Sequence, residues 1–204
     1  MPVLGKTKKD VLLEFRTTEI LAAARSEFAL RGFANATLDS IADRVGIAKG
    51  TIYLYFPSKT DLFLALLRQG VLELHQDVRR EMDAAADTRG KLRAFLRARL
   101  SYCGRNRDFF RIYYTEFVSL RTRITGEKAE FHDLYEQQAQ VLESVLCQGI
   151  RQGELRELNV PKAARLVYEV IRAAVAQHVL EQTGEGVEET ADFTMDLILK
   201  GIAC

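Results

Sequence analysis

The chain has 204 residues, of which 48% are hydrophobic and 28% are charged, and its net charge is +1. This length suffices for one domain or two small ones with a packed core. No run of 18 apolar residues occurs, and the first ten residues, MPVLGKTKKD, lack the apolar centre of a signal peptide. We therefore expect a cytoplasmic protein that does not enter a membrane.

Cysteine and histidine indicate neither a disulfide nor a metal centre. The three cysteines, Cys103, Cys147 and Cys204, show no CxxC spacing, and their odd number favours free thiols in a reducing compartment. The three histidines are scattered along the chain. Because prolines and alternating patterns are few, we predict an all-α fold. We also expect no cofactor.

The N-terminal part predicts two helices that are each ended by a glycine. The first runs from about Thr17 to Arg31 with apolar residues on one face, and Gly32 ends it. Thr37 is a suitable N-cap for the second helix, and Asp39 in the first turn favours the positive end of the helix dipole. Gly46 ends this second helix.

The stretch GIAKGTIYLYFPSK, residues 46–59, predicts a third, short helix. Pro57 stops it, and Ser58 is expected to be the N-cap of a fourth helix, with Asp61 placed as in a capping box. Two short helices joined by a glycine turn, with another helix packed before them, form a helix-turn-helix.

Helical geometry divides the side chains of the third helix between two faces. At about 100° per residue, Ile52 and Phe56 share one face, and we expect them to pack on the first two helices. The opposite side suits DNA, because it offers a glycine for close approach, hydroxyl groups for phosphate oxygens and apolar atoms for thymine methyl groups. An aromatic core is the alternative for the tyrosines, but both lie outside the buried stripe. The residues of this side are Gly50, Thr51 and Leu54, flanked by Tyr53 and Tyr55.

Two lysines flank the third helix. Lys49 lies where the N-terminal residues of a recognition helix contact base edges. Lys59, at the start of the fourth helix, is expected to bind a phosphate beside the helix N-terminus. Residues 1–60 carry nine Lys and Arg against six Asp and Glu, a positive balance that favours nucleic-acid binding. We therefore predict that residues 46–59 contact double-stranded DNA.

Residues 20–63, ILAAARSEFALRGFANATLDSIADRVGIAKGTIYLYFPSKTDLF, contain an ordered set of elements that resembles the DNA-binding domain of the tetracycline-repressor (TetR) family. Ala48 departs from it, because many relatives have a serine cap there, and so does Leu54, at a position that is often polar or aromatic. The elements are ILxAA, Phe28, Gly32-Phe33, Thr37, Ile41-Ala42, Gly46, GTIYLYF, Ser58-Lys59 and Leu62. The resemblance implies that seven residues contact DNA: Thr37, Lys49, Gly50, Thr51, Tyr53, Tyr55 and Lys59.

The remainder of the chain resembles the family only in its helical layout. A long helix is expected from Asp61 to about Ala86. We expect residues 1–60 to form an N-terminal arm and helix-turn-helix domain, which the long helix joins to an all-helical effector-binding and dimerisation domain, residues 61–204. Turn-like segments separate the further helices, which are expected at about Arg89–Cys103, Asp108–Leu120, Lys128–Arg151, Lys162–Gln182 and Glu188–Gly201.

Aromatic residues are concentrated between residues 95 and 135, which contain nine of the eighteen. Ligand pockets are mostly apolar with a few oriented polar groups, and tyrosine supplies both. The TetR resemblance implies a small-molecule effector bound among these central helices, and an ordinary aromatic core is the alternative. The candidate ligand-binding residues are Phe95, Arg99, Tyr102, Phe110, Tyr113, Tyr114, Phe117 and Tyr135.

The same region is strongly basic, with ten Lys and Arg against two Asp and Glu in residues 89–123. Arginine binds carboxylate or phosphate groups through two parallel hydrogen bonds. An anionic effector with an apolar body, such as an acyl-coenzyme A or an aromatic acid, suits this mixture. A solvated face that is partly neutralised by the acidic helix from Glu127 to Glu143 explains the charges equally simply.

The last two predicted helices suit dimerisation. The segment RLVYEVIRAAVAQHVL carries small and apolar residues near one another, and Phe193, Leu197 and Ile198 form a stripe on the final helix. In the TetR family the corresponding helices of two subunits form a four-helix bundle, so the resemblance implies a homodimer. His178 lies either in that interface or in the core of one subunit.

The sequence contains no GxSxG elbow, HExxH motif or glycine-rich phosphate loop, so we expect no catalytic residues. We predict a ligand-responsive transcriptional regulator, in the simplest case a repressor. It would bind a palindromic operator as a dimer and be released by a small lipophilic effector, which the arginines would allow to be anionic. The alternative is a helical DNA-binding regulator without a small-molecule effector.

Overall fold

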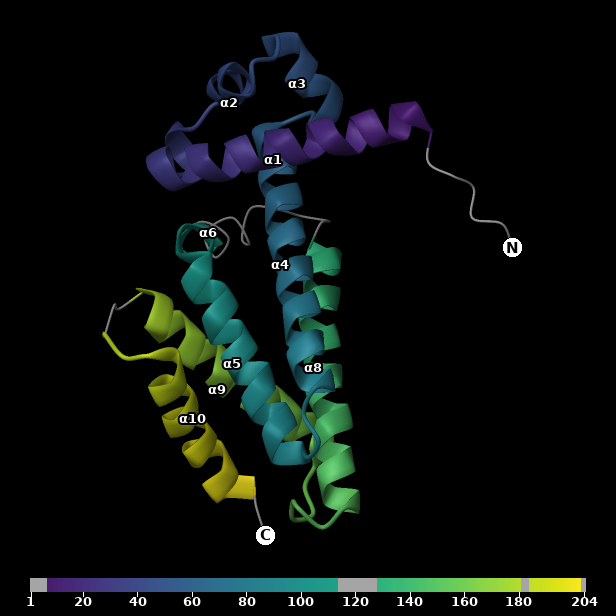
Figure 1. The fold of residues 1–204 in the computed structure, drawn as a ribbon, viewed down its shortest axis with the longest axis vertical. Helices are drawn as coiled ribbons and strands as arrows, with labels where there is room; N and C mark the ends of the chain where they lie inside the picture. Colours follow the sequence, from purple (N-terminus) through teal and green to yellow (C-terminus); the bar gives the residue numbers. More distant parts are fainter. Residues whose placement is uncertain (1–6, 114–127, 181–183, 203–204) are drawn as a thin grey trace. The chain divides into compact units, whose positions relative to one another are not determined.

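The computed structural model describes residues 7–113, 128–180 and 184–202, and the elements in these ranges are α-helices (Figure 1). They confirm the predicted all-α class. The chain forms two compact units, Met1–Gly70 and Val71–Cys204, which meet inside helix α4 (Lys59–Asp83). The predicted functional boundary, between residues 60 and 61, lies at the start of α4 and thus ten residues before this division. The assignment of a function to each part stays a prediction.

The N-terminal unit contains α1 (Lys8–Asn35), α2 (Leu38–Val45), α3 (Lys49–Tyr55) and the first turns of α4. Helix α2 packs against both α1 and α3. This order and packing confirm the predicted helix-turn-helix.

Helix α1 begins at Lys8, well before the predicted start near Thr17. Thr7 caps it, because the Thr7 side chain accepts a hydrogen bond from the Asp10 N–H at 3.2 Å and the Asp10 carboxylate accepts one from the Thr7 N–H at 2.9 Å. Hydrophobic periodicity could not reveal this extension, because its apolar residues are exposed to solvent: Val11, Leu12, Leu13 and Phe15.

Two glycines shape the connections around α2, as the sequence predicted. Gly32 has φ 72° and ψ 166°, which interrupts α1 three residues before its end. Gly46 adopts the left-handed conformation, with φ 74° and ψ 33°, and its N–H bonds to carbonyls of the last turn of α2. A residue with a side chain would be strained at either position.

The core of the N-terminal unit is formed by aromatic and aliphatic side chains from all four helices. The rings of Phe28 and Phe63 meet edge to face with their centroids 5.6 Å apart, and Phe33 lies 4.8 Å from Phe63. Ile41 of α2 and Ile52 of α3 are fully buried. These contacts fix the short helices α2 and α3, which could not be stable alone.

The second unit contains the remainder of α4 and five further described helices. In this unit α5 packs against α8, α9 and α10, and α8 packs along α9 (Figure 1). The helix predicted from Asp108 lies outside the described residues beyond residue 113. In the ranges that are described, no helix is both long and apolar enough to cross a membrane. The five helices are α5 (Thr88–Arg105), α6 (Arg107–Ile112), α8 (Lys128–Arg151), α9 (Val160–Leu180) and α10 (Val187–Ile202).

Candidate nucleic-acid interface

Helix α3 has one buried and one exposed side, as its sequence predicted. Ile52 and Phe56 are buried in the N-terminal unit. On the other side, Leu54 is 83% exposed and Tyr53 is 50% exposed. A Cβ atom added to Gly50 would meet no atom within 4 Å, so the backbone at this glycine is open to a large partner. The exposed side of α3 therefore combines apolar, hydroxyl and bare backbone surface.

Lys49, at the start of α3, forms an exposed ion pair and could exchange its carboxylate partner for another anion. Ala48 provides no side-chain hydrogen bond as the N-cap, which is the departure noted in the sequence. The Lys49 Nζ lies 2.8 Å from Asp39 Oδ2 in a solvent-exposed pair, and this hydrogen bond raises the pKa of Lys49. Exposed pairs contribute little net free energy, so a phosphate can replace the Asp39 carboxylate at small cost.

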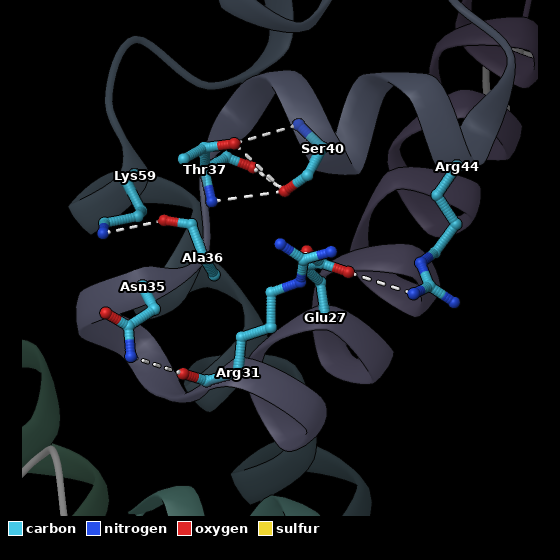
Figure 2. Close-up of polar contacts among 8 residues, drawn as sticks. All are labelled: Glu27, Arg31, Asn35, Ala36, Thr37, Ser40, Arg44 and Lys59. Atoms are coloured by element: carbon cyan, nitrogen blue, oxygen red, sulfur yellow. Dashed lines mark hydrogen bonds and ion pairs between the residues drawn. The ribbon is translucent and has the colours of Figure 1, made fainter.

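Thr37 stands at the start of α2 with its side chain exposed. Its Oγ1 accepts a hydrogen bond from the Ser40 N–H at 3.0 Å, and the Ser40 Oγ accepts one from the Thr37 N–H at 3.3 Å (Figure 2). The predicted N-cap is thus confirmed, and Ser40 completes a reciprocal pair that the sequence analysis did not identify. The cap fixes the position of the Thr37 hydroxyl.

The structure shows contacts of Lys59 that go beyond the sequence-based expectation. The expected phosphate contact stays a prediction; in this structure the Lys59 Nζ donates hydrogen bonds to three backbone carbonyls between α1 and α2, which were not expected. An ammonium has three N–H donors, so these bonds occupy all of them. The acceptors are the carbonyl oxygens of Phe33 at 2.7 Å, Ala34 at 3.0 Å and Ala36 at 2.9 Å.

A buried carboxylate joins α1 to α2 below this surface. The Glu27 side chain is only 2% exposed, and its two oxygens lie 2.9 Å from Arg31 Nε and 3.0 Å from Arg44 Nη2 (Figure 2). Burial alone would raise the pKa of Glu27, but hydrogen bonds from Ser40 and Arg44 and the two arginine charges outweigh it and lower that pKa. This group was not predicted, although a glutamate beside Phe28 on an apolar stripe was a signal for it.

The candidate ligand-binding residues lie in the second unit. Phe95, Arg99, Tyr102 and Phe110 are buried, and Tyr113 is half-buried. Of the remaining candidates, Tyr114 and Phe117 lie outside the described residues, and Tyr135 belongs to α8 but its side chain is not described.

Arg99 is a buried cation in contact with two neighbouring aromatic rings. Its guanidinium carbon lies 5.5 Å from the ring centroid of Phe95 and 5.1 Å from that of Tyr168 in α9, and Nη2 donates to the Tyr168 hydroxyl at 3.3 Å. The sequence analysis did not select Tyr168, although its spacing from Ala164 and Ile171 places it on the inner face of α9. The structure thus brings Phe95 and Arg99 together with a tyrosine from a distant part of the chain.

Tyr102 and Phe110 form a second group with α4. The Tyr102 hydroxyl donates to Glu73 Oε2 at 2.7 Å, and the rings of Tyr102 and Phe110 meet edge to face at 5.9 Å. Burial, assisted by the charges of Arg99 and Arg79, lowers the pKa of His75 to about 4, so this imidazole is neutral at pH 7.

The thiol of Cys103 on α5 is also uncharged. Burial raises its pKa to about 12 despite the nearby Arg99 charge, so it is an unreactive thiol at neutral pH. Among the residues that the structure describes, no group of three or more His, Cys, Asp or Glu is placed to hold a metal ion.

Two arginines of the basic segment 89–123 pair with carboxylates of the same unit. Arg93 pairs with Glu188 and Asp192 of α10, and Arg97 pairs with Glu81 and Glu188. Among the described side chains, carboxylates of α4 and α10 partner these arginines, whereas the side chains of residues 127–135 in the expected acidic helix 127–143 lie outside the description, so that alternative stays untested.

Two further arginines of this segment are also engaged, one by a carboxylate and one by backbone. Arg105 lies 2.9 Å from Asp77 of α4. Arg107 donates to the carbonyl oxygens of His178 and Val179 at the end of α9. Arg99 thus differs from these four described arginines because its guanidinium is buried.

Comparison with known proteins agrees with this arrangement. Residues 20–66 match the family model of bacterial regulatory proteins of the tetR family, and residues 85–202, more than half of the chain, match that of the tetracyclin repressor-like C-terminal domain. The chain belongs to the TetR family. It is therefore a DNA-binding transcriptional regulator and not an enzyme, and the first match covers α2 and α3 with the surface described above.

Two curated relatives are transcriptional or metabolic regulators by their names. The "Fatty acid metabolism regulator protein" of Bacillus subtilis is 23% identical over 185 residues, which cover 90% of this chain and 94% of that protein. The transcriptional repressor KstR2 of Mycobacterium tuberculosis is 32% identical over 158 residues, which cover 77% and 76% of the two chains.

Solved structures show the same fold. The ketosteroid transcriptional regulator KstR2 of M. tuberculosis has a TM-score of 0.69 at 27% identity and covers all of both chains. The regulator FadR of B. subtilis in complex with stearoyl-CoA has a TM-score of 0.78 at 22% identity, covering 90% of this chain and 98% of that one.

We expect the substitution Glu27→Gln to lower the free energy of unfolding at neutral pH by roughly 1–3 kcal/mol, because it removes charge-assisted hydrogen bonds from a buried site. The pKa of Glu27 is lower in the folded state than its ordinary 4.5, so its stabilisation is present above pH 4.5 and is lost as the pH falls through the folded-state value. Urea unfolding of the parent and the variant at pH 3–7 should show their difference shrinking on acidification.

The matched control is Glu19→Gln, which removes an exposed pair with Arg16 on the same helix. Its effect should stay below about 1 kcal/mol. A Glu27→Gln effect as small as this, or one that is independent of pH, would contradict the proposed role of the buried carboxylate.

Proposed function

We propose that this TetR-family regulator binds an inverted-repeat operator as a homodimer and that a lipophilic, anionic effector changes its affinity for that operator. The exposed side of α3 is the observation that carries the proposal. Leu54, Tyr53 and Gly50 lie there without burial, opposite the fully buried Ile52. A short helix with one anchored side and one open side has the form of a recognition helix for the major groove.

Six residues are proposed to contact DNA through hydroxyl, ammonium or backbone groups, besides an apolar contact by Leu54. The hydroxyl groups of Thr37, Thr51 and the two tyrosines would donate to phosphate oxygens, which position the protein without specifying sequence. Lys49 would contribute charge by exchanging its Asp39 partner for DNA. Gly50 would let the backbone approach closely, since its Cβ position is open. The six are Thr37, Lys49, Gly50, Thr51, Tyr53 and Tyr55.

The exposed apolar surface of α9 and α10 supports dimerisation through these helices. On α10, Phe193 is 73% exposed and Leu197, one turn later, is also exposed. On α9, Leu166, Val170 and Ala173 are exposed at spacings that place them on one side. Apolar surface of this kind marks an interaction site, and two such helices from each subunit would form a four-helix bundle.

The surroundings of Arg99 support an anionic effector with an apolar body. A buried guanidinium can bind a carboxylate or phosphate through charge-assisted hydrogen bonds, while Phe95 and Tyr168 supply apolar surface. One similar solved structure is a ketosteroid transcriptional regulator by its name, and another is a regulator in complex with stearoyl-CoA. We therefore favour a fatty acyl or steroid-like acid derivative over a polar effector.

Helix α4 is proposed to carry the signal. It is one continuous helix from Lys59 to Asp83, so its first turns belong to the DNA-binding unit and its last turns to the effector-binding unit. Glu73, which accepts the Tyr102 hydroxyl bond, lies on its second half. An effector that displaces the residues around Tyr102 would tilt α4 and alter the spacing of the two α3 helices in the dimer.

A first expectation concerns base contacts by Leu54. Replacing each operator thymine in turn by deoxyuridine removes one methyl group, and we expect one position per half-site at which the parent loses about fourfold in affinity. For the Leu54→Ala variant, deoxyuridine at that position should no longer lower the affinity, whereas its effect at every other position should equal that in the parent. Equal deoxyuridine profiles for the two proteins would contradict a thymine contact by Leu54.

Dimerisation is tested by placing a charge on the proposed interface. Phe193→Glu should convert the protein to monomers in sedimentation velocity, because an unpaired carboxylate in an apolar interface is costly. Leu30→Glu, at an exposed leucine of α1, is the control and should leave the oligomeric state unchanged. A Phe193→Glu protein that sediments as the parent does would move the interface elsewhere.

The effector is tested by mass spectrometry of small molecules released from purified protein, followed by operator binding with and without a long-chain acyl-coenzyme A. An effector should lower operator affinity by about 5–150-fold. Arg99→Met should abolish the response, whereas Arg97→Met, in the exposed pair with Glu81, should retain it. No effect of any retained or added lipid would favour a TetR-family regulator without an effector.

A further inference from the structure

Lys59 is held by the protein backbone in an arrangement suited to an ammonium group. The carbonyl oxygens of Phe33, Ala34 and Ala36 accept its three hydrogen bonds at 2.7–3.0 Å. The same ammonium lies 4.6 Å from the ring centroid of Phe33, within the range of a cation–π interaction. Figure 2 shows the Lys59 side chain reaching the Ala36 carbonyl.

The three carbonyls belong to the segment where α1 gives way to α2. Gly32 interrupts α1, and the last carbonyls of a helix have no partner within it, so an external donor can satisfy them. A cation at this place satisfies them. Ala36 is the residue directly before Thr37, the N-cap of α2. Lys59 therefore holds the peptide from which the Thr37 hydroxyl projects.

We propose that Lys59 is a positioning residue for DNA binding, which ties the first residue of α4 to the connection before Thr37, rather than a phosphate ligand. The proposal rests on the function proposed above. Its consequence is mechanical: a displacement of the start of α4 is passed to the N-terminus of α2 through the ammonium. Thr37 then moves away from its phosphate together with the connection.

A direct phosphate contact makes a different demand on the same ammonium. On binding DNA, the ammonium would have to break at least one of its hydrogen bonds to a carbonyl. It would also release condensed counterions from the DNA as it neutralised a phosphate. Each neutralised phosphate changes the slope of log affinity against log salt by about 0.9. A positioning residue changes affinity but leaves this slope intact, so salt dependence separates the two roles.

Two matched lysines test the proposal: Lys59→Met and Lys49→Met, each removing one charge from a folded protein verified by circular dichroism. Operator affinity is measured at several salt concentrations. We expect Lys49→Met to flatten the slope by about one unit and Lys59→Met to leave it unchanged while lowering affinity roughly tenfold. A Lys59→Met slope as flat as that of Lys49→Met, or an unchanged affinity, would overturn the proposal.

A second variant keeps the test decisive if Lys59→Met does not fold. Lys59→Arg retains the charge, but a planar guanidinium cannot direct donors at three carbonyls arranged around an ammonium. A positioning role therefore predicts an affinity loss with the parent slope, and this loss should be smaller when Thr37→Ala is already present. Parent-like affinity for Lys59→Arg would overturn the proposal. A parent that binds no sequence specifically would instead contradict the proposed function itself.

Discussion

The N-terminal unit depends on one constraint: α3 has only seven residues, Lys49–Tyr55, and its N-cap Ala48 makes no side-chain hydrogen bond. A helix this short is unstable by itself, because the free energy of nucleating it exceeds what the hydrogen bonds of two turns contribute. Its position must come from the anchors Ile52 and Phe56 and from the elements that receive them. The position of the surface that we propose meets DNA therefore depends on the packing behind it.

Electrostatic contacts supply much of that placement. Buried Glu27 connects α1 to α2 through Arg44, and Lys59 connects α4 to the peptide before Thr37. The two groups have opposite hydrogen-bonding roles: the Glu27 carboxylate accepts from arginines, and the Lys59 ammonium donates to carbonyls. Since each bridges two helices, the orientation of α2 follows that of both α1 and α4. Such a frame can hold a recognition helix and can also transmit a displacement to it.

The elements of this frame differ in how far the sequence predicted them. The caps Thr37 and Ser58, whose hydroxyl oxygens accept from the Ser40 and Asp61 N–H groups, and the turn at Gly46 were predicted correctly, because a cap or a left-handed glycine is a signal within a few residues. The two-sided character of α3 followed from helical spacing alone. The hydrogen bonds of Lys59 to three carbonyls were not predicted, because these partners lie more than twenty residues earlier and no local pattern reveals them. The ion pairs of Arg93 with α10 were hidden for the same reason.

The central claim, that a dimer presents two α3 helices to DNA, is tested most directly by affinity selection from random double-stranded DNA. The account predicts enrichment of an inverted repeat whose half-site centres lie about 34–36 Å apart, one turn of B-DNA, or a multiple of this distance. Substitution of the exposed side of α3, as in Tyr53→Ala, should weaken or alter the enriched half-site while the protein stays folded and dimeric. Two results would contradict the central claim: enrichment of a single unrepeated half-site, or selection of an unchanged repeat by the Tyr53→Ala protein.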